Sequence, residues 1–105
     1  MITQNFRAYL KGDTFKARKV KMNIDISDVE IRIQFRQGSK TGDLMKEAAI
    51  TKISASEFII EKFDLNWDAD FTYYYDAQFT YPDNTIITYF GGSFPIVQDV
   101  TQKID

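Results

Sequence analysis

The sequence contains no cysteine and no histidine, and these two absences exclude much of the chemistry open to a chain of 105 residues. Without thiols there is no disulfide framework and no thiolate nucleophile, and without imidazole most zinc sites and the commonest general base are missing. The serines have no histidine to activate them. We therefore expect no catalytic residue, no metal and no cofactor, and the chain is predicted not to be an enzyme.

Leucine is scarce, with 3 residues, whereas isoleucine, with 13, and aromatic side chains, with 16, are abundant. Because β-branched and aromatic residues favour pleated sheets, this composition predicts a mostly β domain. No segment approaches the ~20 apolar residues of a membrane-spanning helix. Gln4, Asn5 and Arg7 interrupt the first stretch, where a secretory signal needs an apolar run. We expect a soluble protein, made in the cytoplasm, that does not bind membranes.

Two segments alternate apolar and polar residues with period two, which predicts strands with one buried face. They are residues 28–36 and 71–81, and further short strands are predicted at 6–10, 14–26, 58–63, 85–90 and 93–97. Residues 43–50 fit a short helix or a short strand. The pattern predicts one antiparallel β-sandwich domain, residues 1–105. Its expected core contains Val29, Ile31, Ile33, Phe35, Tyr73, Tyr75 and Phe79.

The segment from Tyr81 to Thr85 predicts a tight hairpin turn. Pro82 suits the second position of a type I turn, and Asn84 tolerates the left-handed backbone of a bulge residue. The predicted pairing places Phe79 opposite Ile87, Ala77 opposite Tyr89, and Tyr75 opposite Gly91, with a bulge at Gly91-Gly92.

Residues 1–22 hold six basic residues and one acidic residue, whereas the remainder of the chain has a net charge of −7. A basic segment can form a nucleic-acid patch. The alternative, which we favour because the sequence pI is 5.1, is a first hairpin around residues 11–13 whose basic residues point outward and face acidic neighbours. A bulge near Arg18-Lys19 would reconcile the parity of Phe15 with that of Val20. No nucleic-acid partner is expected.

Several short motifs resemble the small immunoglobulin-like domains of tailed-bacteriophage tail and baseplate proteins, including the N-terminal domain of baseplate upper proteins. They are Lys11-Gly12-Asp13-Thr14-Phe15, Glu57-Phe58-Ile59-Ile60, Tyr73-Tyr74-Tyr75-Asp76-Ala77-Gln78, Pro82-Asp83-Asn84-Thr85, Gly92-Ser93-Phe94 and Asp99-Val100-Thr101. The sequence departs from that pattern at Asn84, where those domains have glycine, and at Asp70-Phe71.

The resemblance implies an immunoglobulin-like β-sandwich and a non-enzymatic bacteriophage or prophage virion structural protein that acts through protein–protein contacts. Its partners would be other virion or tail proteins, and homo-oligomerisation is compatible with such a role. It would be located in the host cytoplasm during assembly and afterwards in the virion. The alternative is a carbohydrate-binding module for a cell-surface glycan, for which Tyr74 and Trp67 are the candidate stacking residues.

Two further surfaces are suggested by the pattern. Residues 64–70 place oxygen ligands at every second position, as in an EF-hand loop, but Ala69 and Tyr75 stand where such a loop needs glycine and glutamate; a polar turn is the favoured interpretation. On the last hairpin, the face opposite the core is unusually apolar for a solvated sheet. This face consists of Tyr74, Asp76, Gln78, Ile86, Thr88 and Phe90. It predicts a protein interface; the alternative is that the C-terminal segment or the loop at residues 37–50 folds over it.

Overall fold

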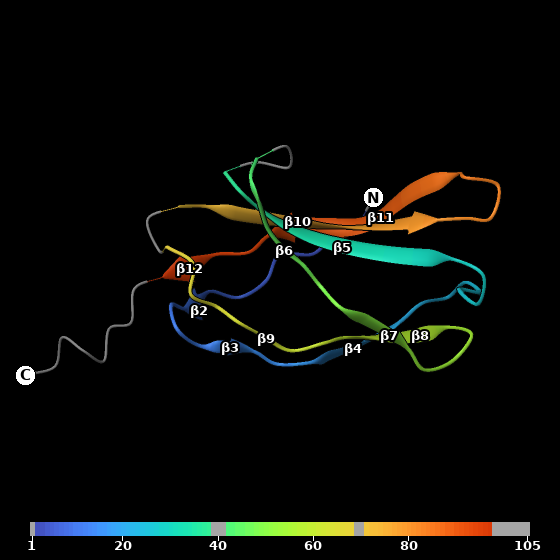
Figure 1. Ribbon diagram of the computed structural model, residues 1–105, viewed down its shortest axis with the longest axis horizontal. Helices are drawn as coiled ribbons and strands as arrows, with labels where there is room; N and C mark the ends of the chain where they lie inside the picture. The colour runs from blue at the N-terminus through green and yellow to red at the C-terminus, as the bar shows by residue number, and fades with distance from the viewer. Residues whose placement is uncertain (1, 39–41, 69–70, 98–105) are drawn as a thin grey trace, which may run out of the picture.

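The computed structural model describes residues 2–38, 42–68 and 71–97. Within these ranges the chain forms strands and no helix, so none of the described residues belongs to a helix that could span a membrane. The strands lie in two layers that face each other across one hydrophobic core (Figure 1). The predicted all-β class and antiparallel β-sandwich are confirmed, with short parallel pairs formed by β1 with β11 and by β2 with β12.

The larger layer is a five-stranded sheet that contains both alternating segments of the sequence. Its order is β1 (Ile2–Thr3), β11 (Ile86–Ser93), β10 (Tyr73–Thr80), β5 (Glu30–Gln37) and β6 (Leu44–Glu47). β5 and β10 pair antiparallel over eight residues each, with Phe35 opposite Tyr75. The segment that the sequence left open between helix and strand is a strand, because its first part pairs with β5.

The opposite layer is one long antiparallel ribbon with a third strand at its side. It consists of β3 (Thr14–Phe15), β4 (Arg18–Lys21), β7 (Ile50–Lys52), β8 (Glu57–Ile60) and β9 (Phe63–Asp64). Phe15 pairs with Phe63 and Arg18 pairs with Ile60, so the register continues across the interruption between β3 and β4. The buried side of the ribbon does change between Phe15 and Val20, as predicted. The bulge predicted near Arg18-Lys19 is wrong, because the change occurs at the break between β3 and β4, with a matching break between β8 and β9.

Residues 2–11, the first segment of the chain, form backbone hydrogen bonds with residues 90–97 and not with the strand that follows them in the sequence. The amides of Gln4, Phe6 and Tyr9 donate to the carbonyls of Gly91, Ser93 and Pro95 at 2.7, 3.0 and 3.0 Å. β2 (Tyr9–Leu10) continues this parallel ladder with β12 (Ile96–Val97). The predicted first hairpin is therefore wrong: its two arms lie in different layers, because the apolar side of each finds a partner far along the chain.

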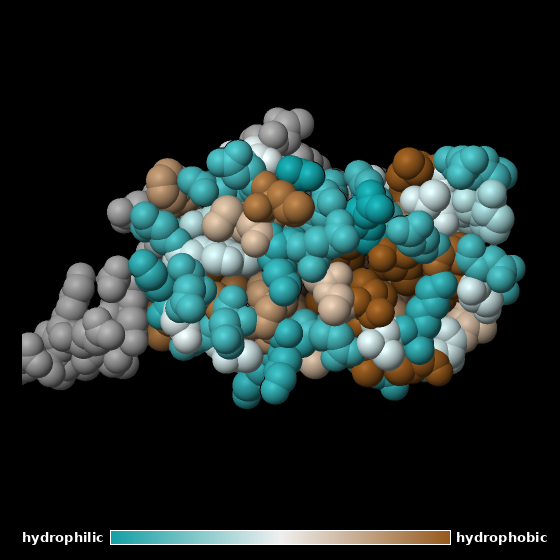
Figure 2. Space-filling model, in the orientation of Figure 1, coloured by the Kyte–Doolittle hydropathy of each residue, from teal (hydrophilic) through white to brown (hydrophobic). Residues whose placement is uncertain are grey.

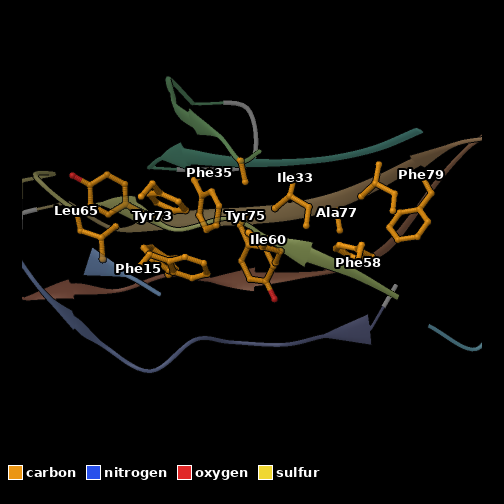
Figure 3. Close-up of a cluster of buried hydrophobic side chains, with 14 of the residues drawn as sticks. Phe15, Ile33, Phe35, Phe58, Ile60, Leu65, Tyr73, Tyr75, Ala77 and Phe79 are labelled. Carbon is orange, nitrogen blue, oxygen red and sulfur yellow. The ribbon is translucent and has the colours of Figure 1, made fainter. Parts of the chain in front are cut away.

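All seven predicted core residues are buried. Figure 3 shows the aromatic part of this core, in which rings from both layers meet between the sheets. The ring centres of Phe35 and Tyr75 are 5.7 Å apart, and those of Phe15 and Phe63 are 4.8 Å apart, both pairs stacked. The ring centres of Phe94 and Phe35 are 4.9 Å apart, and Phe94 helps to fill the end of the core.

The last hairpin follows the predicted turn and then departs from the predicted register. Asn84 has a φ of 70°, the left-handed conformation expected of it, and Phe79 pairs with Ile87. The register then shifts, because Gln78 pairs with Thr88 while Ala77 pairs with Phe90. Tyr89 is the extra residue of this bulge. The bulge thus lies before Gly91-Gly92, and Tyr75 faces Gly92 in place of the predicted Gly91.

The two glycines permit close approach of neighbouring backbone. A Cβ on Gly91 would lie 2.7 Å from the Tyr75 carbonyl oxygen. A Cβ on Gly92 would lie 2.5 Å from the Gln4 carbonyl oxygen. Gly91 therefore permits the close approach of β10, and Gly92 permits the first segment to pack along β11.

Candidate functional site

The way in which β10 pairs with β11 separates the residues of the predicted interface on the last hairpin. Phe90 does not belong to the outer face: it pairs with Ala77, which is fully buried, and its ring centre lies 6.3 Å from that of Tyr75. The bulge at Tyr89 turned it inward. Ile86 pairs with Thr80, six residues from Tyr74 along β10, which separates the two by about 20 Å. No continuous apolar patch joins Tyr74 to Ile86.

The outer face of the larger sheet is a polar network, in which Asp76, Gln78 and Thr88 are half-buried. Gln34 donates to Glu47 at 2.9 Å, and Arg36 donates to Gln34 at 2.8 Å and to the Gly42 carbonyl at 2.9 Å. Figure 2 shows mostly hydrophilic residues where β5 and β6 lie, with a small hydrophobic patch among them. Only the Ile86 end, 60% exposed, keeps the apolar character on which the predicted interface depended. Binding of a partner to this face stays a prediction.

The aspartate-rich segment contributes to packing where it is described; Ala69 and Asp70, part of the predicted loop, lie outside the described residues. Asp64 is in β9 and accepts a hydrogen bond from Thr14 at 3.4 Å. Leu65 is fully buried, and the Asp68 carbonyl accepts a hydrogen bond from Tyr73 at 2.7 Å. The described residues contain no group of three or more Asp, Glu, His or Cys that could hold a metal ion.

The aromatic residues suggested for stacking on sugars do not form an exposed row. Trp67 is half-buried and packs against Tyr73 and Phe63, with ring centres 5.2 and 5.9 Å apart. Tyr74 is half-buried on the outer face of β10. The structure thus provides no flat aromatic platform among these residues, and the carbohydrate alternative loses the observation that motivated it.

The strongest candidate site is a cleft between the edge of β4 and the segment that begins with β1. Its volume is about 620 Å³, within the range of roughly 300–1,000 Å³ that is usual for binding pockets. One wall is the segment from Ile2 to Arg7 and the other runs from Arg18 to Asn23. The floor consists of Ile60, Tyr75, Tyr89 and Phe90, of which Tyr89 and Phe90 are half-buried and the other two are buried.

Basic residues occupy the walls of this cleft. Arg7, Arg18, Lys19 and Lys21 line it, and among the described residues that line it none is acidic. Lys19 forms an ion pair with Glu57, which lies outside the lining, at 3.1 Å. The expected pairing of the basic residues with acidic neighbours therefore holds for Lys19, whereas Arg7 and Lys21 are exposed at the rim.

Arg18 joins the two walls at one end of the cleft. Its guanidinium carbon lies 4.8 Å above the ring centre of Phe6, a cation–π distance, and its Nη2 donates to the Tyr9 hydroxyl at 3.2 Å. Although the backbone of Arg18 belongs to β4, its side chain thus contacts the layer that holds β1. This contact holds the end of the cleft at a defined width.

Tyr75 places a hydroxyl group on the floor. Its hydroxyl donates to the Gln4 carbonyl at 2.6 Å, which ties the first segment to β10. Burial raises the pKa of Tyr75 to about 12, and the charge of Arg18 opposes this shift. The hydroxyl is therefore a neutral donor at ordinary pH. A ligand in the cleft would meet cations at the rim and a largely apolar floor.

Sequence reasoning found the charge of this site but not its shape. The excess of basic residues in positions 1–22 was visible, and four of the six line the cleft. The interpretation as an outward-facing hairpin failed because the two arms belong to different layers. A signal was present in Gly91-Gly92, because glycines on a strand indicate close approach of another backbone. Here β10 approaches Gly91, and the first segment approaches Gly92.

Comparisons with known proteins give little further information. No protein-family model matches the chain, and no curated protein matches it. Among solved structures, a copper resistance protein of Escherichia coli, PcoC, matches with a TM-score of 0.41 and 10% sequence identity, over 83% of this chain and 88% of that chain. A similarity of this degree indicates nothing about what this chain binds.

The predicted function as a bacteriophage tail or baseplate protein requires correction. The solved structure found to be similar is a copper resistance protein, not a virion component, and no family model supports the assignment. One motif of the resemblance, Asp99-Val100-Thr101, lies outside the described residues. The other motifs are short stretches of alternating aromatic strand and tight turn, and a β-sandwich with such stretches can have many functions. The virion role is not retained.

Proposed function

We propose that this chain is a non-enzymatic binding domain that holds an acidic region of a partner protein in the cleft between β1 and β4. The observation that carries the proposal is the combination of an apolar floor with a rim whose charged residues, within the described lining, are all basic. Cations at the rim attract an acidic partner, and burial of apolar side chains on the floor supplies binding energy.

The chemistry of the cleft supports binding and not catalysis. Its titratable side chains are arginine, lysine and tyrosine, and burial holds the Tyr75 pKa near 12, far from the pH at which a proton donor or acceptor works efficiently. The chain also lacks histidine and cysteine. These residues are suited to recognising negative charge.

The test uses an acidic model ligand and a charge reversal with a matched control. A capped decapeptide of alternating glutamate and valine is titrated into the ¹⁵N-labelled domain. We expect saturable amide shifts that cluster on the walls and floor of the cleft. Lys21→Glu is expected to weaken binding about tenfold or more, whereas Lys62→Glu, an equal charge change at an exposed residue outside the lining, is expected to change it less than about twofold.

A different pattern would refute the proposal. Shifts that cluster on the outer face of β10 and β11 would move the binding site to the Ile86 end of the larger sheet. Equal effects of Lys21→Glu and Lys62→Glu would show that the peptide responds to net charge alone and that the cleft has no special role.

A further inference from the structure

We infer that the occupant of the cleft is an extended segment that adds to the edge of β4 as a further strand, with acidic residues at every second position. This inference rests on the proposed function and specifies its partner. Three independent features of the described chain lead to it: an unpaired strand edge, apolar side chains uncovered beside that edge, and the distribution of charge along it.

The edge of β4 presents backbone groups to the cleft. β4 is the outer strand of its sheet, and its inner side pairs with β8. The Met22 amide donates to the Ser56 carbonyl at 2.7 Å, which fixes the alternation: even-numbered residues direct their backbone toward β8. The backbone N–H and C=O groups of Lys19 and Lys21 therefore point toward the cleft, where no described strand pairs with them.

The cleft is the space that another strand of this layer would fill. In many immunoglobulin-like sandwiches the first strand lies in the same sheet as the second. Here the first segment pairs with β11 and β12 in place of β4. As a result Val20 and Met22 are only half-buried and line the cleft, with the buried Ile60 beneath them. A strand added to β4 would cover them with its own inward-facing side chains.

The charge along the edge selects the partner. Lys19 and Lys21 alternate with Val20, so their side chains point to solvent while that of Val20 points inward. A residue paired directly with either lysine would place its side chain on the same outer face, where an acidic group is favourable. A second copy of β4 in the same position would bring lysines together, so this edge disfavours self-association.

The experiment compares two methylated forms of the glutamate–valine decapeptide. If the peptide adds as an antiparallel strand, as we propose, glutamates opposite Lys19 and Lys21 use their own N–H groups to bond β4, whereas the valine N–H groups point away. N-methylation of the glutamates is therefore expected to lower affinity about tenfold or more. N-methylation of the valines is expected to have less than about a threefold effect, which controls for changes in peptide flexibility.

Hydrogen exchange in the bound domain gives a second readout. The amides of Lys19 and Lys21 are expected to exchange at least about tenfold more slowly when the peptide is bound. The Val20 amide already points toward β8 and is expected to change much less. A block peptide, with five glutamates followed by five valines, has the same charge and composition but should bind more weakly, because it cannot alternate its faces.

The possible failures are distinguishable. If the peptide binds in the cleft but both methylated forms bind equally, strand addition is wrong while the proposed function stands. If oleate shifts the same amides at lower concentration than the peptide, the occupant is a small amphipathic anion. If Lys19 and Lys21 are already protected in a dimer of the free domain, the occupant is a second copy. If no peptide binds saturably, both proposals fail.

Discussion

The sandwich has two sides along which the edges of its layers face each other, and these two sides are covered in different ways. On one side the chain runs directly from β6 in the larger sheet to β7 in the smaller one (Figure 1). Ala48, at this crossing, is buried, and its amide donates to the Ile33 carbonyl at 2.9 Å. On the other side β1 and β4 diverge, and the cleft lies between them.

The charges of the two sides also differ. At the β6–β7 side Glu47 and Glu61 accompany Lys46, whereas the charged residues described in the cleft are basic only. Mixed charge at an edge is typical of a solvated surface, whereas charge of one sign beside uncovered apolar atoms is typical of a binding site. At the crossing, the link between β6 and β7 covers part of the core, whereas no described strand covers the cleft between β1 and β4.

The largest expected effect contrasts the closed core with the open edge. Ile33→Ala or Phe79→Ala should lower the free energy of unfolding by about 2–5 kcal/mol, because both side chains are fully buried. Val20→Ala, at the half-buried edge of the cleft, should cost less than about 1.5 kcal/mol, since its surroundings are already open. Urea unfolding measures both; equal losses would mean that the cleft is packed as tightly as the core.

A second change acts on one wall of the cleft. Gly92→Ala should destabilise the domain by about 1–3 kcal/mol, because the added Cβ would meet the Gln4 carbonyl oxygen at 2.5 Å. Backbone has to move to relieve this contact, so exchange of the Gln4 and Phe6 amides should accelerate. Ser93→Ala serves as the control on the same strand. An unchanged stability would show that the first segment is only loosely held on β11.

A third prediction concerns alkaline pH. Burial raises the pKa of Tyr75 from 10 to about 12, so the folded state favours the protonated phenol. This contribution is fully present below pH 10 and is lost as pH rises from about 10 to about 12, by on the order of 2 kcal/mol. Tyr75→Phe should lose the hydrogen bond to Gln4 at every pH but show a shallower alkaline decline. The measurement is urea unfolding at pH 8–12; identical slopes would place the effect elsewhere.

The smallest expected effect on stability is at the hairpin turn, which is distant from both sides of the sandwich and serves as a baseline. Asn84 has a left-handed backbone at the hairpin turn, so Asn84→Gly should be neutral or slightly stabilising. Asn84→Val should lose about 1 kcal/mol, because β-branched residues disfavour positive φ. Neither variant should alter peptide binding. A change in affinity from either would show that the turn communicates with the cleft, which the fold gives no reason to expect.

The long strands and the turn could be predicted because their causes are local. Alternation in residues 28–36 and 71–81 identified the buried faces of β5 and β10. The tolerance of asparagine for left-handed backbone predicted the conformation of Asn84. The bulge at Tyr89 could not be predicted in the same way. Aromatic side chains on both parities of β11 fit either face, so the choice depended on which ring packed best against Tyr75 and Phe79.

By itself the sequence determined the sandwich class, the main core residues, the turn and the surplus of positive charge near the start of the chain. The tertiary structure alone decided where that charge lies, because strand partners are chosen between residues far apart. Residues 2–11 pair with residues 90–97, and this choice left β4 with an unpaired edge. Local alternation specifies which side of a strand is buried, but hydrogen-bonding partners depend on the packing of the whole chain.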